Sequence, residues 1–359
     1  MQRRIFRFGD DLSAFAGAVL CRDISAPSDG KPVTIRRGVP LAEALERLPW
    51  RHDGIEITVL VPDAGELAQP DASARLAEGV AGPGIAPDSP HQGQVNLRAA
   101  IAGLLRVDPA AVARLNRSGV ALVATALDGR VVREGETVAI VKAPALFVES
   151  AKVERALGRL RGRPVVRVAP FRAQRVALVA GTRIRRAQLE VATRHLSSHL
   201  EHFGAQLIAT RHLDNDDPGE IARTYRALLE DGVELVLTAG SIMLDPEDPF
   251  IVAARRVRAR IACIGAPIDP GTMFWVAYAG EVPMFGLASC ELYGRLSIFD
   301  LLLPYALAGE PITRDLLAEL GYGGLLSETQ HARRPPGWYR QADDETATAH
   351  PEPTSSHDA

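Results

Sequence analysis

The sequence predicts an α/β fold for its C-terminal half, because short apolar runs alternate there with amphipathic helical patterns. The strand-like runs lie at 175–180, 205–210 and 233–238, and the helical patterns between them at 186–203 and 218–230. Strands separated by helices of this length form right-handed βαβ crossovers, which build a mainly parallel sheet. We therefore predict one mainly parallel α/β domain over residues 166–325.

Further patterns complete this domain. Asp217 and Glu220 form a capping box at the start of the helix 218–230, with Pro218 at its first position. The elements expected after the third strand are a helix at 250–259, a strand at 261–264, a hairpin of 274–279 with 282–287, and a helix at 297–307. The chain is polar and lacks periodicity beyond residue 325, so we expect a disordered tail over 326–359.

Two smaller modules are predicted before this domain. Residues 1–85 read as a small α+β module, with strands at 17–21, 32–35 and 55–61 and a helix at 41–48. A Pro- and Gly-rich passage at 81–90 indicates a linker. Residues 86–165 read as a β-containing module, with two helical segments within 93–116, strands within 120–148 and a basic helix at 153–163.

Length, charge and composition exclude several classes of protein. A chain of 359 residues with 47% apolar content predicts two or three domains with real cores. A net charge of −3 and only 5% aromatic residues argue against nucleic acid as a partner. No apolar run reaches the length of a membrane span, and the three cysteines are far apart, as expected of reduced thiols. We expect a cytoplasmic protein without a membrane partner.

The stretch 235–249 is the most informative in the chain, because an apolar strand runs into a small-residue turn and then two carboxylates. Gly240 and Ser241 allow a ligand to approach the backbone, and Asp245 and Asp248 add negative charge before the next helix. Ligands of open α/β sheets bind outside the carboxyl ends of the strands, so this turn is a candidate site for phosphate or a metal ion. Asp248 also fits a simple N-cap, with Pro249 at the first helical position.

Three histidines form a stripe on the predicted helix 186–203. His195, His199 and His202 recur at spacings that place them on one face, which is a spacing that metal ligands use. No carboxylate or cysteine of that helix falls on the stripe, and apolar residues lie next to it. We therefore interpret the stripe as a solvated flank of the helix rather than a metal site.

Several blocks of the sequence resemble one known family. The turn Thr-Ala-Gly-Ser at 238–241, followed by Asp245 and Asp248, is similar to that family's Gly-rich turn and acidic residues. Ala-Pro-Ile-Asp-Pro-Gly at 266–271 resembles its Pro-Val-Asp-Pro-Gly-Asn segment, and 286–304 resembles its second glycine loop and following helix. The remaining matching blocks are 93–97 and 138–142, and together they cover most of residues 15–312. The family is that of molybdenum-cofactor biosynthesis proteins with a MoCF-type (MoaB/Mog) molybdopterin-binding domain, most of all its MoeA-like branch.

The resemblance implies a three-layer α/β domain of the molybdopterin-binding type at 166–325 and a role in molybdenum-cofactor biosynthesis. It implies a transferase reaction in which Mg²⁺ assists insertion of molybdate into molybdopterin or its adenylylated form. Asp245 and Asp248 match the catalytic and metal-binding positions. The residues matching cofactor-binding positions are Thr238, Gly240, Ser241, Asp269, Gly271, Gly286, Ser289 and Arg295. The implied partners are molybdopterin, molybdate, a client molybdoenzyme or another cofactor-biosynthesis protein, and further copies of the chain in a homo-oligomer.

Departures from the family's pattern keep a second function class open. Ala288 and Ser289 stand where the family has a Pro-Gly pair, and Ile298 stands where it has a glycine. A non-glycine residue costs backbone energy wherever positive φ is needed, and a β-branched side chain restricts a loop that approaches a ligand. The alternative is a non-catalytic protein with a degenerate active site that binds, delivers or senses molybdopterin.

Overall fold

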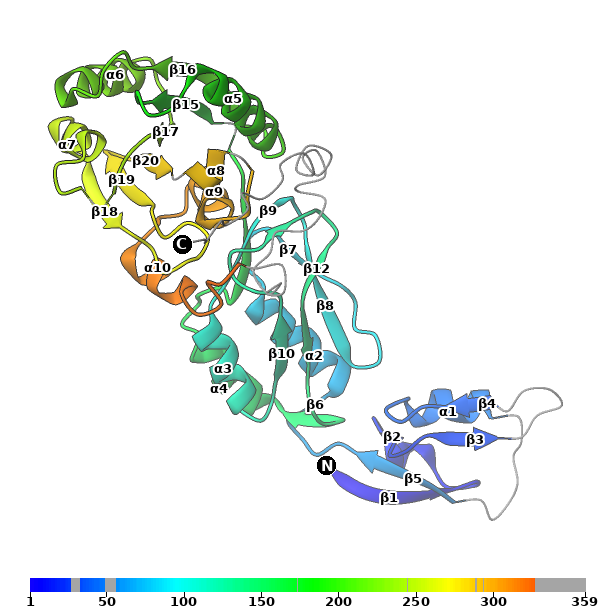
Figure 1. Ribbon diagram of the computed structural model, residues 1–359. Coiled ribbons are helices and arrows are strands. Elements are labelled where there is room, and N and C mark those ends of the chain that lie inside the picture. Colours follow the sequence, from blue (N-terminus) through cyan, green and yellow to red (C-terminus); the bar gives the residue numbers. More distant parts are fainter. Residues whose placement is uncertain are drawn as a thin grey trace, which may run out of the picture. The chain divides into compact units, whose positions relative to one another are not determined.

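The computed structural model describes residues 1–26, 33–48, 56–172, 174–243, 245–287, 289–292 and 294–326 (Figure 1). The chain divides into two compact units. The first unit consists of Met1–Ile101, Leu105–Asp128 and Val132–Val168. The second unit consists of Ala102–Leu104, Gly129–Val131 and Ala169–Ala359. Two three-residue pieces of the predicted middle module thus belong to the unit that holds the predicted α/β domain.

The first part of the first unit has its own small apolar core. An antiparallel sheet is formed by β1 (Gln2–Arg7), β5 (Glu56–Val61) and β2 (Val19–Leu20). The other elements are the 3-10 helix η1 (Leu12–Phe15), the hairpin of β3 (Ile24–Ala26) with β4 (Val33–Ile35), and the helix α1 (Leu41–Arg47). Phe6, Leu20, Ile35 and Val59 are buried together. The predicted helix and strands are confirmed for the described residues.

The remainder of the first unit contains three helices and the strands of three separate sheets. A four-stranded antiparallel sheet has the order β10 (Leu122–Thr125), β12 (Thr137–Lys142), β8 (Gln94–Ala99) and β7 (Ile85–Pro87), and β13 (Phe147–Glu149) pairs with β6 (Glu66–Ala68). The third sheet contains β9 (Gly103–Val107) and β14 (Val166–Pro170), of which 105–107 and 166–168 lie in this unit. The helices are α2 (Gln69–Val80), α3 (Pro109–Arg117) and α4 (Ser150–Gly158). The short strand β11 (Val131–Val132) follows β10 in the chain.

Two predictions for this region were wrong. Only one of the two helices expected within 93–116 exists, because residues 94–99 form β8, in which half-buried and buried residues alternate. Alternation with period two is the pattern of a strand that covers a core with one face. The passage 81–90, predicted as a linker, contains β7, which pairs with β8 through Ile85 and Ala99. The helix α2 was not predicted at all.

The second unit is built on a six-stranded sheet of order β16-β15-β17-β20-β19-β18. Its strands are β15 (Arg175–Ala180), β16 (Gln206–His212), β17 (Leu235–Ala239), β18 (Arg260–Ile264), β19 (Trp275–Ala279) and β20 (Val282–Leu287). Its helices are α5 (Arg186–Glu201), α6 (Pro218–Glu230), α7 (Pro249–Arg256), α8 (Ser289–Leu292), α9 (Ile298–Ala308) and α10 (Arg314–Leu320). The neighbours from β16 to β20 pair in parallel, and β19 is antiparallel to both of its neighbours.

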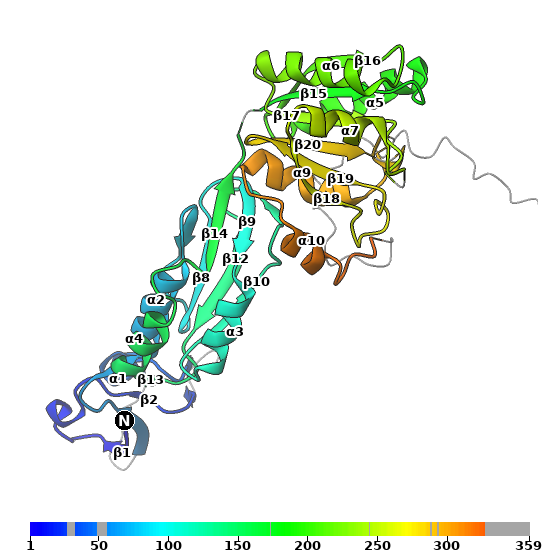
Figure 2. The same cartoon turned by 90° about the vertical axis from the view of Figure 1, so that its left-hand side faces the viewer.

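Helices cover both faces of this sheet, so the unit has three layers (Figure 2). Leu178 and Leu237 share a core with residues of α5, α9 and α10, whereas Val179 and Val236 share a core with residues of α6 and α7. Neighbouring residues of one strand therefore enter different cores, which explains why the central strands are apolar throughout. The predicted α/β architecture with a mainly parallel sheet is confirmed.

The end of the described chain is packed against the second unit. Leu326 is buried, its N–H donates to the Asp269 carbonyl at 2.8 Å, and Leu325 forms a β-bridge with Asp269. The tail predicted for 326–359 lies outside the described residues except for Leu326, which does not belong to a tail. In the part of the chain that the structure describes, no helix is both long and apolar enough to cross a membrane.

Candidate functional site

The topology of the second unit identifies the edge of the sheet at which a ligand would bind. The chain leaves β15 through α5 to β16 on one side, then returns through α6 to β17 on the other side of β15. The strand order reverses between β15 and β17, and open α/β sheets bind ligands at the carboxyl ends of such strands. We call this edge, with the turns 181–185 and 265–274 and the described residues 240–243, 245–248, 289–292 and 294–297, the carboxyl edge.

The strand register brings the predicted glycines to this same edge. Thr238 is paired with Gly286, and Gly286 with Trp275, so the ends of β17 and β20 lie level with the start of β19. Ile264 at the end of β18 pairs with Trp275 as well, which adds the loop 265–274 to the carboxyl edge. Gly240, which follows β17, and Gly286, near the end of β20, thus lie at the same end of the sheet.

Gly240 supplies the sharp turn after β17. Its φ is +102°, in the region that favours glycine, and a Cβ there would lie 3.4 Å from the Gly181 nitrogen. Gly181 donates its N–H to the Ala239 carbonyl at 2.9 Å, so the turns after β15 and β17 lie directly against each other. Thr182 braces the first of these turns by donating its N–H and its hydroxyl to Asp216, at 2.9 and 2.6 Å.

Asp248 is fully buried and organises the second turn. Its Oδ1 accepts the N–H groups of Phe250 and Ile251 at 2.9 and 3.0 Å, so it is the N-cap of α7, as predicted. Its Oδ2 accepts the Ser241 hydroxyl at 2.9 Å and the Ile242 N–H. Four donors occupy the lone-pair directions of a carboxylate. The geometry therefore favours the capping interpretation of Asp248 over that of a metal ligand.

The side chains of Thr238 and Ser241 are also held by protein groups. The Thr238 hydroxyl is buried and lies 3.0 Å from the Tyr225 hydroxyl. Burial raises the pKa of Tyr225 well above its ordinary value, so this phenol is neutral. The Ser241 hydroxyl accepts the Trp275 indole N–H at 3.0 Å while it donates to Asp248. These contacts shape the turn. Thr238 is fully buried and paired with Val179 on one side and Gly286 on the other, so the structure gives it a packing role.

Gly286 is a glycine because of the indole beside it. A Cβ on Gly286 would overlap the Trp275 ring, since the nearest ring atom lies 1.9 Å from that position. The cross-strand pairing of Gly286 with Trp275 lets the ring lie flat over the backbone and reach Ser241. In the structure, Gly286 allows the Trp275 ring to pack closely against the backbone. No pattern in the sequence identified Trp275 as a neighbour of this turn.

Asp245 differs from Asp248 because it is exposed. Its Oδ1 accepts the Glu247 N–H at 2.9 Å, and its carbonyl accepts the Asp248 N–H at 3.1 Å. These are contacts within one turn and leave the carboxylate at the surface of the carboxyl edge. Among the residues described, no three His, Cys, Asp or Glu side chains cluster so as to hold a metal ion.

The loop 265–274 places Asp269 and Gly271 at the same edge. Asp269 is exposed, and its backbone is held by Gly324 and Leu326. Gly271 has φ of +115°, and a Cβ on it would lie 2.5 Å from the Ile298 Cγ2. Ile298 also donates its N–H to the Pro270 carbonyl at 3.2 Å. The loop thus packs against the first turn of α9, where Ile298 is a buried core residue.

The last two predicted residues follow β20. Ser289 begins α8, and its side chain lies outside the described part of the structure, as does residue 288. Arg295 is exposed between α8 and α9 and has no hydrogen bond or ion pair with a described residue. Arg183 and Arg185, on the turn after β15, are exposed on the same edge and were missed. Their position directly after the strand predicted at 175–180 is the sequence signal that could have identified them.

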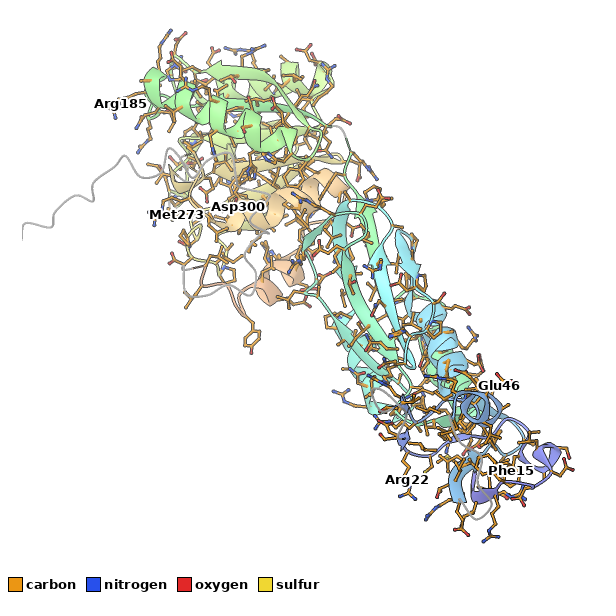
Figure 3. All side chains as sticks on the ribbon, turned by 90° about the vertical axis from the view of Figure 1, so that its right-hand side faces the viewer. Phe15, Arg22, Glu46, Arg185, Met273 and Asp300 are labelled. Atoms are coloured by element: carbon orange, nitrogen blue, oxygen red, sulfur yellow. The ribbon has the colours of Figure 1, made fainter. Side chains whose placement is uncertain are left out.

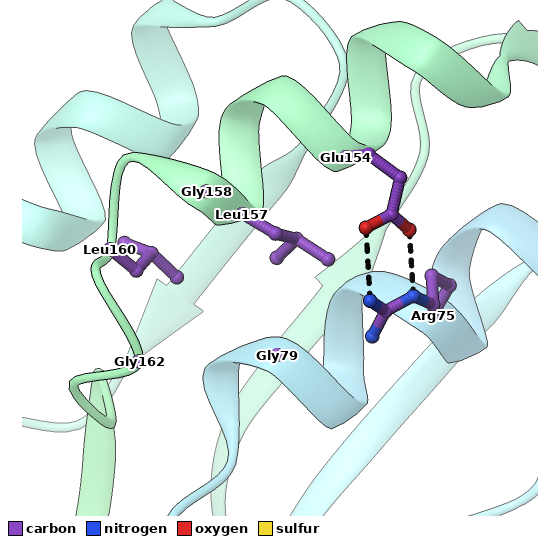
Figure 4. Close-up of a pocket in the computed structure, with 7 residues that line it drawn as sticks. All are labelled: Arg75, Gly79, Glu154, Leu157, Gly158, Leu160 and Gly162. Carbon is purple, nitrogen blue, oxygen red and sulfur yellow. Dashed lines mark hydrogen bonds and ion pairs between the residues drawn. The ribbon is translucent and has the colours of Figure 1, made fainter.

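A groove of about 300 Å³ lies in the first unit and is separate from this site (Figure 4). It runs between α2 and α4 over Gly79, Leu157 and Leu160. Arg75 donates two hydrogen bonds to Glu154 at its rim, at 2.8 and 3.0 Å. Because these two charges pair with each other, they do not favour a ligand of either charge in the groove.

Comparisons with known proteins find only weak likenesses. No family model and no curated protein matches the chain. Among solved structures, the molybdopterin biosynthesis enzyme MoaB of Thermus thermophilus is 16% identical, with a TM-score of 0.28, over 38% of this chain and 98% of the other. A molybdopterin biosynthesis protein of Mycobacterium abscessus is 15% identical, with a TM-score of 0.30, over 42% and 98%. A structure of MogA is 15% identical, with a TM-score of 0.27, over 38% and 97%. At such TM-scores these likenesses carry no argument about function.

Proposed function

We propose that the chain binds molybdopterin and acts in molybdenum-cofactor biosynthesis, with the carboxyl edge of the second unit as its ligand site. One observation supports this above the others. The three blocks of sequence that resemble the family, at 238–248, 266–273 and 286–304, are far apart in the chain but begin at one edge of one sheet. A resemblance due to chance composition has no reason to gather at the edge where α/β sheets bind ligands.

The chemistry of this edge suits a ligand with a terminal phosphate. The turn at Gly240 is half-buried at the carboxyl edge, and its φ of +102° is a conformation that glycine adopts readily. Backbone N–H groups of such turns can form a concave site for an anion. Arg295, Arg183 and Arg185 bring guanidinium groups to the same edge, and a guanidinium recognises phosphate through two parallel hydrogen bonds. In this proposal the amides of the turn receive the phosphate and Arg295 pairs with its charge.

The proposal extends to catalysis of molybdate insertion, for which Asp245 is the candidate ligand of Mg²⁺. Mg²⁺ in enzymes is commonly held by one or two carboxylates together with phosphate oxygens and water. Asp245 is exposed at the edge and fits such a set, whereas Asp248 does not, because its oxygens already accept four hydrogen bonds. With Mg²⁺ bound, the ion would neutralise charge on the phosphate, and Asp245 would orient it.

The alternative is a molybdopterin-binding protein without catalysis, which delivers or senses the cofactor. The occupied carboxylate of Asp248 and the buried Ile298 at the start of α9 favour this alternative, because both remove functional groups that chemistry at the edge would use. The client molybdoenzyme and the homo-oligomer implied by the family remain part of the proposal.

The proposal is tested by the small molecules that the protein retains. The full chain is purified from a molybdopterin-producing host, and mass spectrometry identifies what it releases on denaturation. A pterin with a terminal phosphate supports the proposal, and its absence from repeated preparations refutes it. Turnover with molybdate and Mg²⁺ then separates the enzyme from the binding protein, since only the enzyme yields molybdenum-loaded product.

A further inference from the structure

The turn after β15 carries two exposed arginines, Arg183 and Arg185, at the carboxyl edge. Among the residues that the structure describes, neither of them forms an ion pair. Figure 3 shows Arg185 at the start of α5, at the same end of the second unit as Met273 of the loop 265–274. A guanidinium binds an anion at a lower entropic cost when its backbone is already held in place, so the contacts of this turn determine what the arginines can do.

Three segments that are separate in the chain hold the backbone of this turn. Gly181 donates its N–H to the last carbonyl of β17 at 2.9 Å. The Ile184 carbonyl accepts a hydrogen bond from Nε2 of His212, at the end of β16, at 2.7 Å. The third segment is the loop before α6, where Asp216 accepts the N–H and the hydroxyl of Thr182. The turn is thus fixed at its start, in its middle and near its end.

The contact with Asp216 is the only one of the three that uses a charged side chain. Its Oδ1 accepts the Thr182 N–H at 2.9 Å, and its Oδ2 accepts the Thr182 hydroxyl at 2.6 Å. A carboxylate beside arginines commonly pairs with a guanidinium, and such a pair competes with an external anion. Within the described part of the chain, Asp216 forms no ion pair. It therefore holds the turn without neutralising Arg183, the next residue along.

The close approach of Asp216 depends on a glycine. A Cβ on Gly181 would lie 2.7 Å from Oδ1 of Asp216 and 2.6 Å from Cζ of Phe250. Phe250 is buried in the first turn of α7, the helix that Asp248 caps. The turn after β15 is therefore packed between the loop before α6 and the start of α7, which leaves it little room to shift.

We propose that Asp216 and Thr182 are positioning residues, whose double hydrogen bond fixes the turn 181–185 so that Arg183 and Arg185 receive an oxyanion of the phosphate or sulfate type. The inference rests on the proposed function in one respect, namely that the natural ligand carries such an oxyanion. Binding of a simple inorganic oxyanion at this turn does not depend on the identity of that ligand.

The charge of Asp216 gives the inference a sign that separates it from two simpler roles. A carboxylate near an anion site repels the anion, so its removal by itself should raise the affinity for the anion. Positioning predicts a lower affinity, because the turn loses two hydrogen bonds and the arginines lose their fixed backbone. A purely structural role predicts lower stability of the chain, with no change in the affinity of the molecules that are folded.

Calorimetric titration of the full chain with inorganic sulfate tests the inference. Thr182→Val removes the hydroxyl but keeps the branched shape and the N–H, and it should weaken sulfate binding about tenfold, as for the loss of a hydrogen bond to a charged group. Thr182→Ser keeps the hydroxyl and should bind sulfate as the parent does. Asp216→Ala should weaken binding by about tenfold as well, although it removes a negative charge.

Asp214→Ala is the matched control for charge. It removes an exposed aspartate from the same loop, and that side chain makes no hydrogen bond or ion pair with a described residue. Sulfate binding should not weaken in this variant. Arg183→Ala and Arg185→Ala should each weaken binding about tenfold, as for the loss of one guanidinium contact.

Several outcomes overturn the proposal. Parent-like affinity in Thr182→Val or in folded Asp216→Ala contradicts the positioning role, and so does a weakened Thr182→Ser or an equal loss in Asp214→Ala. If Asp216→Ala does not fold, the two Thr182 variants decide. A parent that binds no sulfate, or full affinity in Arg183→Ala and Arg185→Ala, shows that this turn does not receive the anion. Pterin retention is a separate measurement, so its failure refutes the proposed function and leaves the sulfate result standing.

Discussion

Single residues decide what the turn after β17 can do, and Asp248 is the clearest case. Sequence alone left it between an N-cap and a metal ligand, and the four hydrogen bonds to its carboxylate favour the structural role. Asp245, three residues earlier, accepts one hydrogen bond from its own turn and is exposed. The two carboxylates look alike in the sequence because burial, which separates them, is a property of the folded chain.

The stability of two variants separates these roles. Asp248→Ala removes a helix cap and leaves the Ser241 hydroxyl and the Ile242 N–H without their acceptor, so it should cost about 3 kcal/mol. Asp245→Asn should change stability by less than about 0.5 kcal/mol, as is usual for exposed positions. Chemical denaturation of both variants beside the parent gives the comparison. If Asp245→Asn proved the more destabilising of the two, the structural role would belong to Asp245.

The stability cost of substituting Gly286 should depend on its neighbour Trp275. Gly286→Ala should cost about 3 kcal/mol through overpacking, because the new methyl group overlaps the Trp275 indole. In a Trp275→Leu background the same change should cost less than about 1 kcal/mol, since the overlap is gone. A double-mutant cycle by denaturant unfolding measures the difference. Equal costs in both backgrounds would show that Gly286 is required for a reason other than the ring.

Among the elements, the strands β15 to β20 and the helices α5, α6, α7 and α9 of the second unit were predictable because each signal is local, whereas the short helices α8 and α10 were not predicted. The strand β17 and the helix α6 have apolar periodicity, caps and lengths that agree with one another. The strand β8 and the helix α2 were not found, because β8 carries polar residues on its half-exposed face and α2 lacks a side-chain cap. The positions of Gly240 and Gly286 at strand ends were predictable, but the contact of Gly286 with Trp275 was not. His199, predicted on a solvated flank, is buried. Both features depend on packing between elements that are distant in the sequence.

Truncation near the end of the described chain tests which of the last residues contribute to thermal stability. A chain that ends at Leu326 should unfold at the same temperature as the full chain, because the sequence beyond offers no apolar face to bury. A chain that ends at Gly324 loses the buried Leu326 and its hydrogen bond to Asp269, worth about 2 kcal/mol, and should unfold about 5 °C lower. Calorimetry of both chains decides. A shorter chain as stable as the longer one would mean that Leu326 does not dock.

In the whole molecule, the proposed ligand site lies in the second unit, and the first unit contributes only two of the sequence blocks that resemble the family. The blocks at 93–97 and 138–142 form β8 and part of β12, which pair through Val95 and Val141. Their resemblance to the family is thus explained by sheet pairing, with no ligand needed. The ligand site is instead predicted at the carboxyl edge, where the other blocks gather.

Pterin retention by charge-matched variants tests whether molybdopterin binds at the carboxyl edge. The parent, Arg295→Ala and Arg226→Ala are purified in parallel from a molybdopterin-producing host, and mass spectrometry quantifies the pterin per chain. Arg226 is an exposed arginine on α6 and serves as the control for loss of one positive charge. We expect the parent and Arg226→Ala to retain equal amounts, and Arg295→Ala to retain about tenfold less, as for the loss of one guanidinium contact to phosphate. Equal retention by all three would place the ligand elsewhere than at the carboxyl edge, and no pterin in the parent would contradict molybdopterin binding itself.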